Sequence, residues 1–482
     1  MGASQTLSVI VLAAGKGTRL CSELPKVLHP LMQRPLLDHV LSSVEQASLP
    51  IGQACVVVGH QAQPVTAFLN ERQNITTAWH PVLQSPQLGT GHALQTVAKA
   101  VSLDDCVFLL SGDVPLLQAQ TLHQLKKDFD RLRAQDQVAM VVVGAPLDDP
   151  TGYGRLIQSP DGSLQAIVEE KDATPEQRHI KTVNAGIYAF HWPTVAPWLN
   201  ELSNNNAQNE LYVTDLVGLA RQKNCTVGVF TLTNPHEMLG VNSRADLAHC
   251  HQELNRRTTQ YWMNQGVTII DPTTTWISPE VVHIGMDTVI EPHCHLLGAI
   301  SIGNACLIGA NTQLRGNVTI GHRTTVTASV VSDSTLGDDC TIGPFAHLRN
   351  QTVVANQVRI GNFVEVKQTT IGHSTNAAHL SYLGNAVLGD DVNIGAGTII
   401  ANYDPIRKIK HTTHIGNSVK VGCNSVLVAP VTVGTNACVA AGTVVTKTVD
   451  PEALAIARPE QKNIKGWVQR TLNQLLAKAS QQ

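Results

Sequence analysis

Apolar and polar residues alternate in blocks of two lengths from the start of the chain to about residue 240. Short apolar runs lie at residues 9–14, 54–59, 106–110, 138–143 and 186–190. Longer amphipathic stretches, such as residues 36–46, separate several of these runs. Buried strands that alternate with helices are typical of a mainly parallel sheet covered by helices on both faces. The pattern predicts a doubly wound, Rossmann-like α/β domain over residues 1–244.

The pattern changes at residues 244–263. This stretch is polar, contains little Gly or Pro, and carries Leu247, Leu254, Tyr261 and Trp262. Uninterrupted helix-forming sequence between two differently patterned halves predicts a connecting helix. We place this linker at residues 245–265, between the α/β domain and a second domain over residues 266–482.

The second half repeats an aliphatic residue followed by glycine. The spacing within unbroken stretches is six or a multiple of six, as from Ile302 to Ile308 to Ile320. Each unit supplies a short strand with one inward aliphatic side chain and a turn of small residues. Three strands close one coil, and stacked coils pair in parallel, so a hexapeptide-repeat β-helix is predicted. The period alone does not give its handedness, and the usual crossover rule favours a right-handed coil.

Composition and charge narrow the possible partners. The chain of 482 residues has 34 basic and 37 acidic residues, and no long block of like charge. Nucleic acid is therefore not an expected partner. The start of the chain is polar, and the first apolar run is too short for a signal segment or a membrane span. We expect a cytoplasmic protein without a membrane partner.

A glycine-rich basic turn follows the first predicted strand. Residues 12–19 read L-A-A-G-K-G-T-R, and Pro25-Lys26 follow. Backbone N–H groups of such a turn approach phosphates, and Lys16, Arg19 and Lys26 add the positive charge that a triphosphate requires. The alternative is a simple strand-to-helix turn with a solvated basic face. Three cations and two glycines in one short stretch favour phosphate binding.

This turn resembles the signature of the sugar-phosphate nucleotidylyltransferases, L-x-x-G-x-G-T-R followed by P-K, and the resemblance continues through most of the chain up to Asn242. It implies that Gln84 with Gly89 and Thr90 reads uracil, and that Asp113 and Asn242 hold Mg²⁺. The full set of substrate contacts that it implies is Leu12, Ala13, Ala14, Gly15, Arg19, Lys26, Gln84, Gly89, Thr90, Ser111, Gly112, Asp113, Gly154, Glu169, Asn184 and Asn242. Gly154, Glu169 and Asn184 are the positions that would hold the sugar.

Several polar residues interrupt the hexapeptide pattern. Residues 361–397 contain Glu365, Lys367, His379, Tyr382 and Asn393, and a loop at 402–413 lengthens the spacing of the repeat. A lone histidine in such a turn is usually structural. The concentration of polar residues around this one favours a site instead.

Residues 378–386, A-H-L-S-Y-L-G-N-A, and the stretch from N-I-G-A-G-T to N-Y-D at 393–404 resemble the acetyltransferase half of the bifunctional family that makes UDP-N-acetylglucosamine. That resemblance covers the whole chain and implies a left-handed coil and a homotrimer. It implies His379 as general base, Arg349 and Lys367 on the phosphate of glucosamine 1-phosphate, and Tyr382 and Asn393 on the sugar. The implied acetyl-CoA contacts are Ala396, Asn402, Tyr403, Cys423, Ala441 and Arg458. Cys423 replaces the family's usual serine, and Pro405 its usual glycine.

The resemblance therefore implies two reactions. Acetyl-CoA would acetylate glucosamine 1-phosphate, and UTP would then uridylylate N-acetylglucosamine 1-phosphate, which feeds peptidoglycan and lipopolysaccharide precursors. One alternative is a single-function sugar nucleotidylyltransferase with a structural or regulatory β-helix, and another is a non-enzymatic regulatory protein. His379, Tyr382 and the 402–413 loop favour the bifunctional enzyme over the first alternative. Asp113 and Asn242 together with the basic turn weigh against the second.

Overall fold

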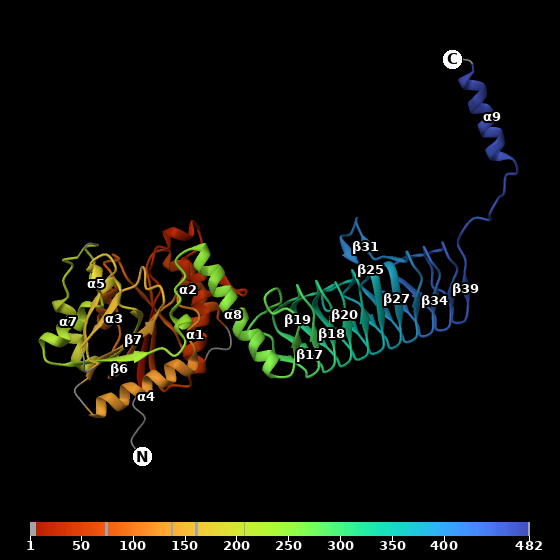
Figure 1. Cartoon of the computed structure of the whole chain (residues 1–482). Helices are drawn as coiled ribbons and strands as arrows, with labels where there is room; N and C mark the ends of the chain where they lie inside the picture. The colour runs from red at the N-terminus through yellow and green to blue at the C-terminus, as the bar shows by residue number, and fades with distance from the viewer. Residues whose placement is uncertain (1–5, 73–75, 136–137, 160–161, 207, 481–482) are drawn as a thin grey trace. The chain divides into compact units, whose positions relative to one another are not determined.

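The computed structural model describes residues 6–72, 76–135, 138–159, 162–206 and 208–480. The chain divides into two compact units, residues 1–255 and 256–482 (Figure 1). The predicted connecting helix is present as α8 (Arg244–Asn264), and the division between the units falls within it.

A twisted sheet forms the centre of the first unit. Its main strand order is β11 (Thr226–Thr231), β7 (Val138–Pro146), β10 (Thr182–His191), β6 (Cys106–Ser111), β1 (Leu7–Leu12), β4 (Ile51–Val58) and β5 (His80–Leu83). All neighbours are parallel except β10, which runs antiparallel to both β6 and β7. The carboxyl ends of β1 and β6 therefore meet at one edge, where ligands of open α/β sheets bind.

Helices cover both faces of this sheet. One core contains buried side chains of α1 (Leu36–Gln46), α2 (Ala62–Glu71) and α4 (Ala119–Gln135). The other contains side chains of α3 (Thr90–Ala100) and α7 (Asp215–Gln222). Successive side chains of β1 point to opposite faces of the sheet, so Val9 and Val11 lie in the first core and Ile10 lies in the second. The doubly wound α/β prediction is confirmed.

A hairpin that the pattern did not predict branches from this sheet. Its strands, β8 (Arg155–Gln158) and β9 (Leu164–Val168), are antiparallel, and β8 pairs with β10 through Arg155 and Val183. The hairpin places Gly154 and Glu169 at its two ends.

The second unit is a stack of short parallel strands, from β12 (Thr268–Ile269) to β39 (Leu454–Ala455). Ile302 pairs with Ile320, and Ile320 pairs with Leu336, so one aliphatic residue of each coil lies on that of the next. These side chains are almost completely buried in one continuous core. The parallel hexapeptide architecture is confirmed, and it is consistent with the left-handed β-helix that the resemblance implies.

Small hydroxyl residues satisfy the backbone inside the turns of the stack. The side chains of Thr324, Thr375 and Ser425 are buried, and each donates a hydrogen bond to a glycine carbonyl at 2.7–2.9 Å. Buried polar groups must find such partners. The prism can therefore be narrow and still leave these hydroxyls satisfied.

One coil is longer than its neighbours. A regular coil takes the chain from Ile302 to its partner Ile320, whereas the partner of Ile394 in β29 (Asn393–Ile394) on the following coil is as far along the chain as Val421. Part of the additional chain forms a small antiparallel hairpin of β31 (Tyr403–Asp404) and β32 (Ile409–Lys410). Figure 1 shows β31 projecting from the side of the β-helix near β25.

The last described element is α9 (Trp467–Ala479), in which no residue is buried. Among the residues that the structure describes, no helix is both long enough and apolar enough to cross a membrane.

Candidate active sites

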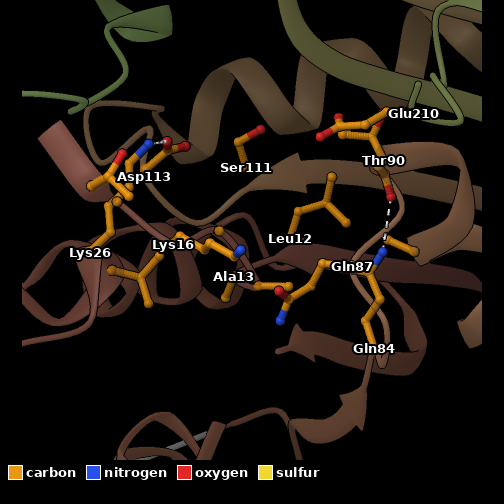
Figure 2. A pocket seen from close by; sticks show the side chains of 17 residues that line it. Leu12, Ala13, Lys16, Lys26, Gln84, Gln87, Thr90, Ser111, Asp113 and Glu210 are labelled. Carbon is orange, nitrogen blue, oxygen red and sulfur yellow. Dashed lines mark hydrogen bonds and ion pairs between the residues drawn. The ribbon is translucent and has the colours of Figure 1, made fainter. Parts of the chain in front are cut away.

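A cavity of about 530 Å³ opens at the carboxyl ends of β1 and β6 (Figure 2). Most of the residues predicted to contact the nucleotide line it. They are Leu12, Ala13, Ala14, Gly15, Lys26, Gln84, Gly89, Thr90, Ser111 and Asp113. Lys16 of the basic turn lines it as well. The structure thus brings together segments that are far apart in the sequence.

Two glycines shape the turn after β1. Gly17 has φ 61°, and a Cβ built on it would lie 2.7 Å from Lys26 Cβ, so any side chain there would displace Lys26. Gly15 has no atom within 4 Å of such a Cβ, and the space above it belongs to the cavity. Gly17 lets Lys26 pack against the turn, and Gly15 leaves room for a phosphate.

Lys26 joins the two predicted metal ligands. Its ammonium donates a hydrogen bond to Asn242 Oδ1 at 2.7 Å and forms an ion pair with Asp113. The Gly112 N–H donates a hydrogen bond to the Leu12 carbonyl oxygen at 2.9 Å. A Cβ on residue 112 would lie only 3.0 Å from the same oxygen, so glycine allows this close approach. Val241 N–H donates to the Asp113 carbonyl at 2.9 Å and brings Asn242 alongside.

The opposite end of the cavity is built around Gln84, which is 4% exposed. Its Nε2 donates to the Gly89 carbonyl at 2.9 Å (Figure 2). It also lies 3.2 Å from His92 Nδ1. Thr90 Oγ1 accepts a hydrogen bond from Val213 N–H at 3.0 Å. Backbone contacts of the 88–91 turn with the 211–213 segment also bring Glu210 to the cavity wall.

A second cavity, of about 400 Å³, shares Leu12, Thr90 and Ser111 with the first. It contains Glu169 and Asn184, two of the residues predicted to hold the sugar. Burial raises the pKa of Glu169, and the negative charges of Asp172 and Asp215 raise it further. Asn184 Nδ2 donates to Tyr188 Oη at 2.7 Å, and its Oδ1 accepts from Gly186 N–H at 3.0 Å. A sugar held here would therefore lie next to the nucleotide cavity.

Four predicted residues do not line either cavity: Arg19, Gly112, Gly154 and Asn242. Gly112 and Asn242 lie directly behind Asp113, as described above. Gly154 accepts a hydrogen bond from Asn184 N–H at 2.8 Å, and a Cβ on it would approach Glu169 Oε1 at 3.3 Å. Arg19 lies in the short helix Thr18–Leu20 and is exposed.

Sequence reasoning missed several residues of these cavities. The cavity residues that it did not name as contacts include Gln87, Glu210, Lys171, Asp172, Tyr188 and Tyr212. Gln87 lies between Gln84 and Gly89, so its position in the sequence was a usable signal. Glu210 and Tyr212 reach the site only through the packing of the 210–213 segment on the 88–91 turn.

The second unit gathers the predicted sugar-phosphate residues on one face. Arg349 of β23 (His347–Arg349) pairs with Lys367 of β25 (Arg359–Lys367), and Lys367 pairs with Gly384 of β27 (Asn376–Gly384). Glu365 pairs with Tyr382 on the same two strands. Arg349 Nη2 donates to Glu365 Oε1 at 2.6 Å.

His379 and four of the six predicted acetyl-CoA contacts share one edge of the prism. Hydrogen bonds of 2.7–2.9 Å link successive coils along this edge, from Gly397 N–H to the Leu380 carbonyl, from Asn424 N–H to Ala396, and from Gly442 N–H to Cys423. Arg458 Nη1 extends the series by donating to the Ala441 carbonyl at 2.7 Å. The predicted residues that the edge brings together are His379, Ala396, Cys423, Ala441 and Arg458. An extended row of this kind suits an extended ligand.

Three predicted residues lie away from that edge. Asn393 pairs with Asn376, at the start of β27, rather than with the half of β27 that carries Tyr382. Asn402, which is 5% exposed, donates through Nδ2 to Asn385 Oδ1 at 2.7 Å, and Tyr403 begins the β31–β32 hairpin.

Pro405 lies in the turn of this hairpin. The Asp404 carboxylate accepts hydrogen bonds from the N–H groups of Ile406 and Arg407 at 2.9 and 3.0 Å. The turn needs no N–H from residue 405, so proline can replace glycine at this position without loss of a hydrogen bond.

Comparisons with known proteins agree with this division. Residues 9–176 match the MobA-like NTP transferase domain, residues 277–377 the GMPPB C-terminal domain, and residues 412–447 the bacterial transferase hexapeptide repeat. Proteins called "Bifunctional protein GlmU" are similar over almost the full chain. That of Trichlorobacter lovleyi is 44% identical over 95% of this chain and 97% of its own length. Those of Prochlorococcus marinus and Synechococcus elongatus are 43% and 44% identical over 96% and 97% of this chain and all of their own lengths.

Fold and site together define a nucleotidyltransferase domain joined to a hexapeptide-repeat transferase domain. Because the similarity spans nearly the whole chain, the chain belongs to the family of bifunctional GlmU proteins.

Proposed function

We propose that this chain is a bifunctional enzyme of UDP-N-acetylglucosamine synthesis. It transfers the acetyl group of acetyl-CoA to glucosamine 1-phosphate, and it then transfers uridylyl from UTP to N-acetylglucosamine 1-phosphate and releases pyrophosphate. The observation that carries the proposal is the presence of two separate sites, a nucleotide cavity with Lys26 and Asp113 and a prism edge with His379. Membership of the GlmU family supports it. Cytoplasmic location and a role in peptidoglycan precursor supply belong to the same proposal.

In the uridylyl site, a phosphate oxygen of the sugar attacks the α-phosphorus of UTP in line, and pyrophosphate leaves. The two substrates are both anions, so positioning and charge neutralisation carry most of the catalysis. Lys16 and Lys26 line the cavity and supply positive charge, while Gly15 leaves space for phosphate beside backbone N–H groups. The adjoining cavity with Glu169 and Asn184 orients the sugar.

Asp113 and Asn242 would hold a magnesium ion. The donor chemistry fits, because Mg²⁺ prefers carboxylate and carbonyl oxygens and completes its shell with phosphates and water. Their oxygens already converge on one cation, the ammonium of Lys26. When bound, the ion supplies neutralisation of the charge that develops on the phosphates. Lys26 would then be released toward the phosphates.

In the acetyl site, the amine of glucosamine 1-phosphate must lose a proton as it attacks the thioester carbon. His379 lies on the prism edge, beside the row that includes Ala396 and Cys423. A neutral imidazole nitrogen can accept this proton as general base, and the CoA thiolate leaves as the tetrahedral intermediate collapses. Arg349 and Lys367 neutralise the sugar phosphate, and Tyr382 and Asn393 contact the sugar.

The proposal includes a homotrimer. Phe345 and Phe363 stack on the edge that carries His379, with ring centroids 5.5 Å apart, and they are 57% and 62% exposed. Leu380, the next residue along this edge, is 61% exposed. Exposed apolar patches of this kind mark contact surfaces. Burial of this edge between neighbouring prisms would place the acetyl-CoA row in a groove between subunits.

The test is an assay of the purified chain with acetyl-CoA, glucosamine 1-phosphate, UTP and magnesium, in which free thiol and pyrophosphate are measured separately. Wild type should form both. His379→Ala should slow thiol release by about 10²- to 10⁴-fold, the usual contribution of a general base, and leave pyrophosphate release from N-acetylglucosamine 1-phosphate unchanged. A folded His379→Ala variant within a few-fold of wild type would exclude His379 as the base. Pyrophosphate without any thiol release by wild type would support the single-function alternative.

A further inference from the structure

The side-chain nitrogen of Gln84 has two acceptors, and both belong to the start of α3. Gln84 Nε2 lies 2.9 Å from the carbonyl oxygen of Gly89, which directly precedes this helix, and 3.2 Å from Nδ1 of His92 in its first turn. Figure 2 shows the first of these contacts. A glutamine amide nitrogen carries two N–H groups and accepts no hydrogen bond, so it is the donor in both contacts. The protein itself therefore occupies both N–H groups of Gln84.

The fold holds both sides of this contact in place. Gln84 directly follows β5, and its backbone N–H donates to the Val58 carbonyl at the end of β4 at 2.8 Å. On the other side, the Gly91 N–H at the start of α3 donates to the Leu211 carbonyl at 2.7 Å. The Gln84 side chain is also almost completely buried. Neither the amide nor the helix start can shift far without breaking these backbone hydrogen bonds.

Rotation of this amide would be unfavourable. A half-turn would set Gln84 Oε1 against the Gly89 carbonyl and the lone pair of His92 Nδ1, two acceptors to which it cannot bond. Burial, and the positive charge of Lys99, lower the pKa of His92, so its imidazole is neutral near pH 7 and keeps that lone pair. Among the residues that the structure describes, none donates a hydrogen bond to Gln84 Oε1, and Gln84 lines the nucleotide cavity. Oε1 is therefore the group that Gln84 presents to a ligand.

We infer that His92 is a positioning residue that makes the nucleotide cavity prefer uracil to cytosine. Together with the Gly89 carbonyl, it holds the Gln84 amide so that a carbonyl oxygen, and not an amino group, faces the base. Uracil carries an N3–H donor that this oxygen can accept, whereas cytosine carries a lone pair at N3 and an amino group in place of O4. Cytosine would therefore leave Gln84 Oε1 against another acceptor. The inference rests on the proposed uridylyl transfer and adds a residue that itself touches no substrate.

The experiment compares the full-length wild type with His92→Phe, which removes the acceptor, and with His92→Asn, whose side-chain oxygen can take the place of Nδ1. His92→Ala is a second variant without an acceptor, for use where thermal unfolding shows that phenylalanine does not fit. His123→Phe is the control, because His123 is an exposed histidine of α4 that lines neither cavity. Pyrophosphate release with N-acetylglucosamine 1-phosphate gives kcat/KM for UTP and for CTP, and calorimetry gives the dissociation constants of both nucleotides.

His92→Phe should lower the ratio of kcat/KM for UTP to kcat/KM for CTP by about tenfold, the effect of losing one buried hydrogen bond that opposes rotation of the amide. His92→Asn should recover most of the ratio, and His123→Phe should match wild type. A merely structural role of His92 would lower the activity with both nucleotides equally. An unchanged ratio in folded His92→Phe or His92→Ala would therefore overturn the inference.

A double variant tests whether His92 acts through Gln84. Gln84→Leu removes the amide, so it should lose most of the preference for UTP. His92→Phe in that background should then change the ratio no further, because two residues that act as one unit are not additive. An equal fall of the ratio on His92→Phe substitution with and without Gln84 would refute the positioning role.

Failure of the proposed uridylyl transfer has a different result. If wild type releases no pyrophosphate with either nucleotide, the reaction is wrong, and the calorimetric constants alone decide about His92. A preference for UTP that falls about tenfold in His92→Phe and returns in His92→Asn would then support the inference. A wild type that binds CTP as tightly as UTP, or that binds neither nucleotide, would refute it.

Discussion

At the scale of single residues, Lys26 shows how the uridylyl site is assembled. Its side chain packs on Gly17, pairs with Asp113 and donates to Asn242, a residue 216 positions away. Gly112 lets the ends of β6 and β1 approach closely enough for this contact. Each of these residues is of an ordinary type. Their arrangement, with two oxygen donors directed at one cation, gives the site its chemistry.

Replacement of Asp113 by alanine should separate the two activities. The variant loses the carboxylate that would bind magnesium, a contribution of several kcal/mol to transition-state stabilisation, so pyrophosphate formation should fall by about 10³-fold. Acetyl transfer should stay near wild type, because its residues lie in the other unit. The measurement is the pair of rates on one preparation with an unchanged circular dichroism spectrum. Equal loss of both activities in the folded variant would refute independent sites.

Glu169 provides a pH-dependent prediction. Its pKa in the folded chain is raised above the ordinary value of 4.5, mainly by burial, so the folded state binds its proton more tightly than the unfolded state does. The ionised carboxylate therefore destabilises the fold, and this penalty grows as pH rises above 4.5 through the raised pKa. Glu169→Gln should unfold at a higher Tm than wild type at pH 8, and the difference should vanish near pH 4. Binding of N-acetylglucosamine 1-phosphate should weaken.

Glu170→Gln is the matched control, because the pKa of Glu170 is shifted in the opposite direction to that of Glu169. Arg155 donates to this carboxylate at 2.6 Å, and this hydrogen bond lowers the pKa of Glu170. The stabilising contribution of Glu170 is present above its ordinary pKa and is lost as pH falls through the lowered value. Glu170→Gln should therefore lower Tm at pH 8. Thermal unfolding of both variants between pH 4 and pH 8 would show the contrast, and parallel curves would contradict the role given to burial.

At the scale of elements, the β-helix depends on close contact between coils. Turn residues of one coil donate to carbonyl groups of the neighbouring coil, and the inward aliphatic residues fill the core. Several glycines of the repeat have no space for a side chain because the next coil lies directly against them. Gly361 is one of these, and its neighbour on the next coil is the backbone carbonyl of Ala378. This carbonyl directly precedes His379.

Gly361→Ala should destabilise the β-helix and disturb its site. The new Cβ would overlap the Ala378 carbonyl oxygen, which belongs to a paired strand and cannot move freely. Overpacking of this kind costs about 1–3 kcal/mol. Thermal unfolding should show a lower Tm, and thiol release should fall while pyrophosphate release persists. Gly218→Ala in α7, where no atom lies within 4 Å, is the control and should be neutral or stabilising by about 0.5–1 kcal/mol. A Gly361→Ala variant as stable as wild type would contradict this account of the stack.

At the scale of the whole molecule, two units carry separate chemistry, and α8 is continuous from one to the other. Each unit has its own buried core. Stability and activity of one unit can therefore be changed without the other. The β-helix has an additional role in the proposal, because its exposed edge with Phe345 and Phe363 is the surface on which copies would meet.

A charge on that edge should dissociate the assembly. Phe363→Glu would place a carboxylate where the proposed interface is apolar, and burial of an unpaired charge is strongly unfavourable. Light scattering should show a fall from three times 51.7 kDa to 51.7 kDa. Thiol release should fall and pyrophosphate release should persist. Met286→Glu, at an exposed apolar residue far from Phe363 in the sequence, should remain trimeric. A monomeric wild type with full acetyl-transfer activity would refute the shared-site proposal.

Both folds could be predicted from the sequence alone, because each follows from a local period. Alternating strands and helices predicted the doubly wound sheet, and the six-residue repeat predicted the parallel stack, since these periods fix which side chains are buried. The basic turn was also predictable, because its residues are contiguous. The roles given to His379 and to the acetyl-CoA contacts came from resemblance and stay predictions.

Which distant residues meet could not be predicted in this way, because it depends on how the elements pack in three dimensions. The approach of Lys26 to Asn242 depends on strand order, and the arrival of Glu210 at the nucleotide cavity depends on the packing of one loop on another. Tyr403 pairs with Lys410 because the long coil folds back as a hairpin, and Asn402 anchors the base of this hairpin to Asn385. Sequence periodicity fixes which face of an element is buried, whereas contacts between elements depend on register and loop path, and no local pattern encodes these.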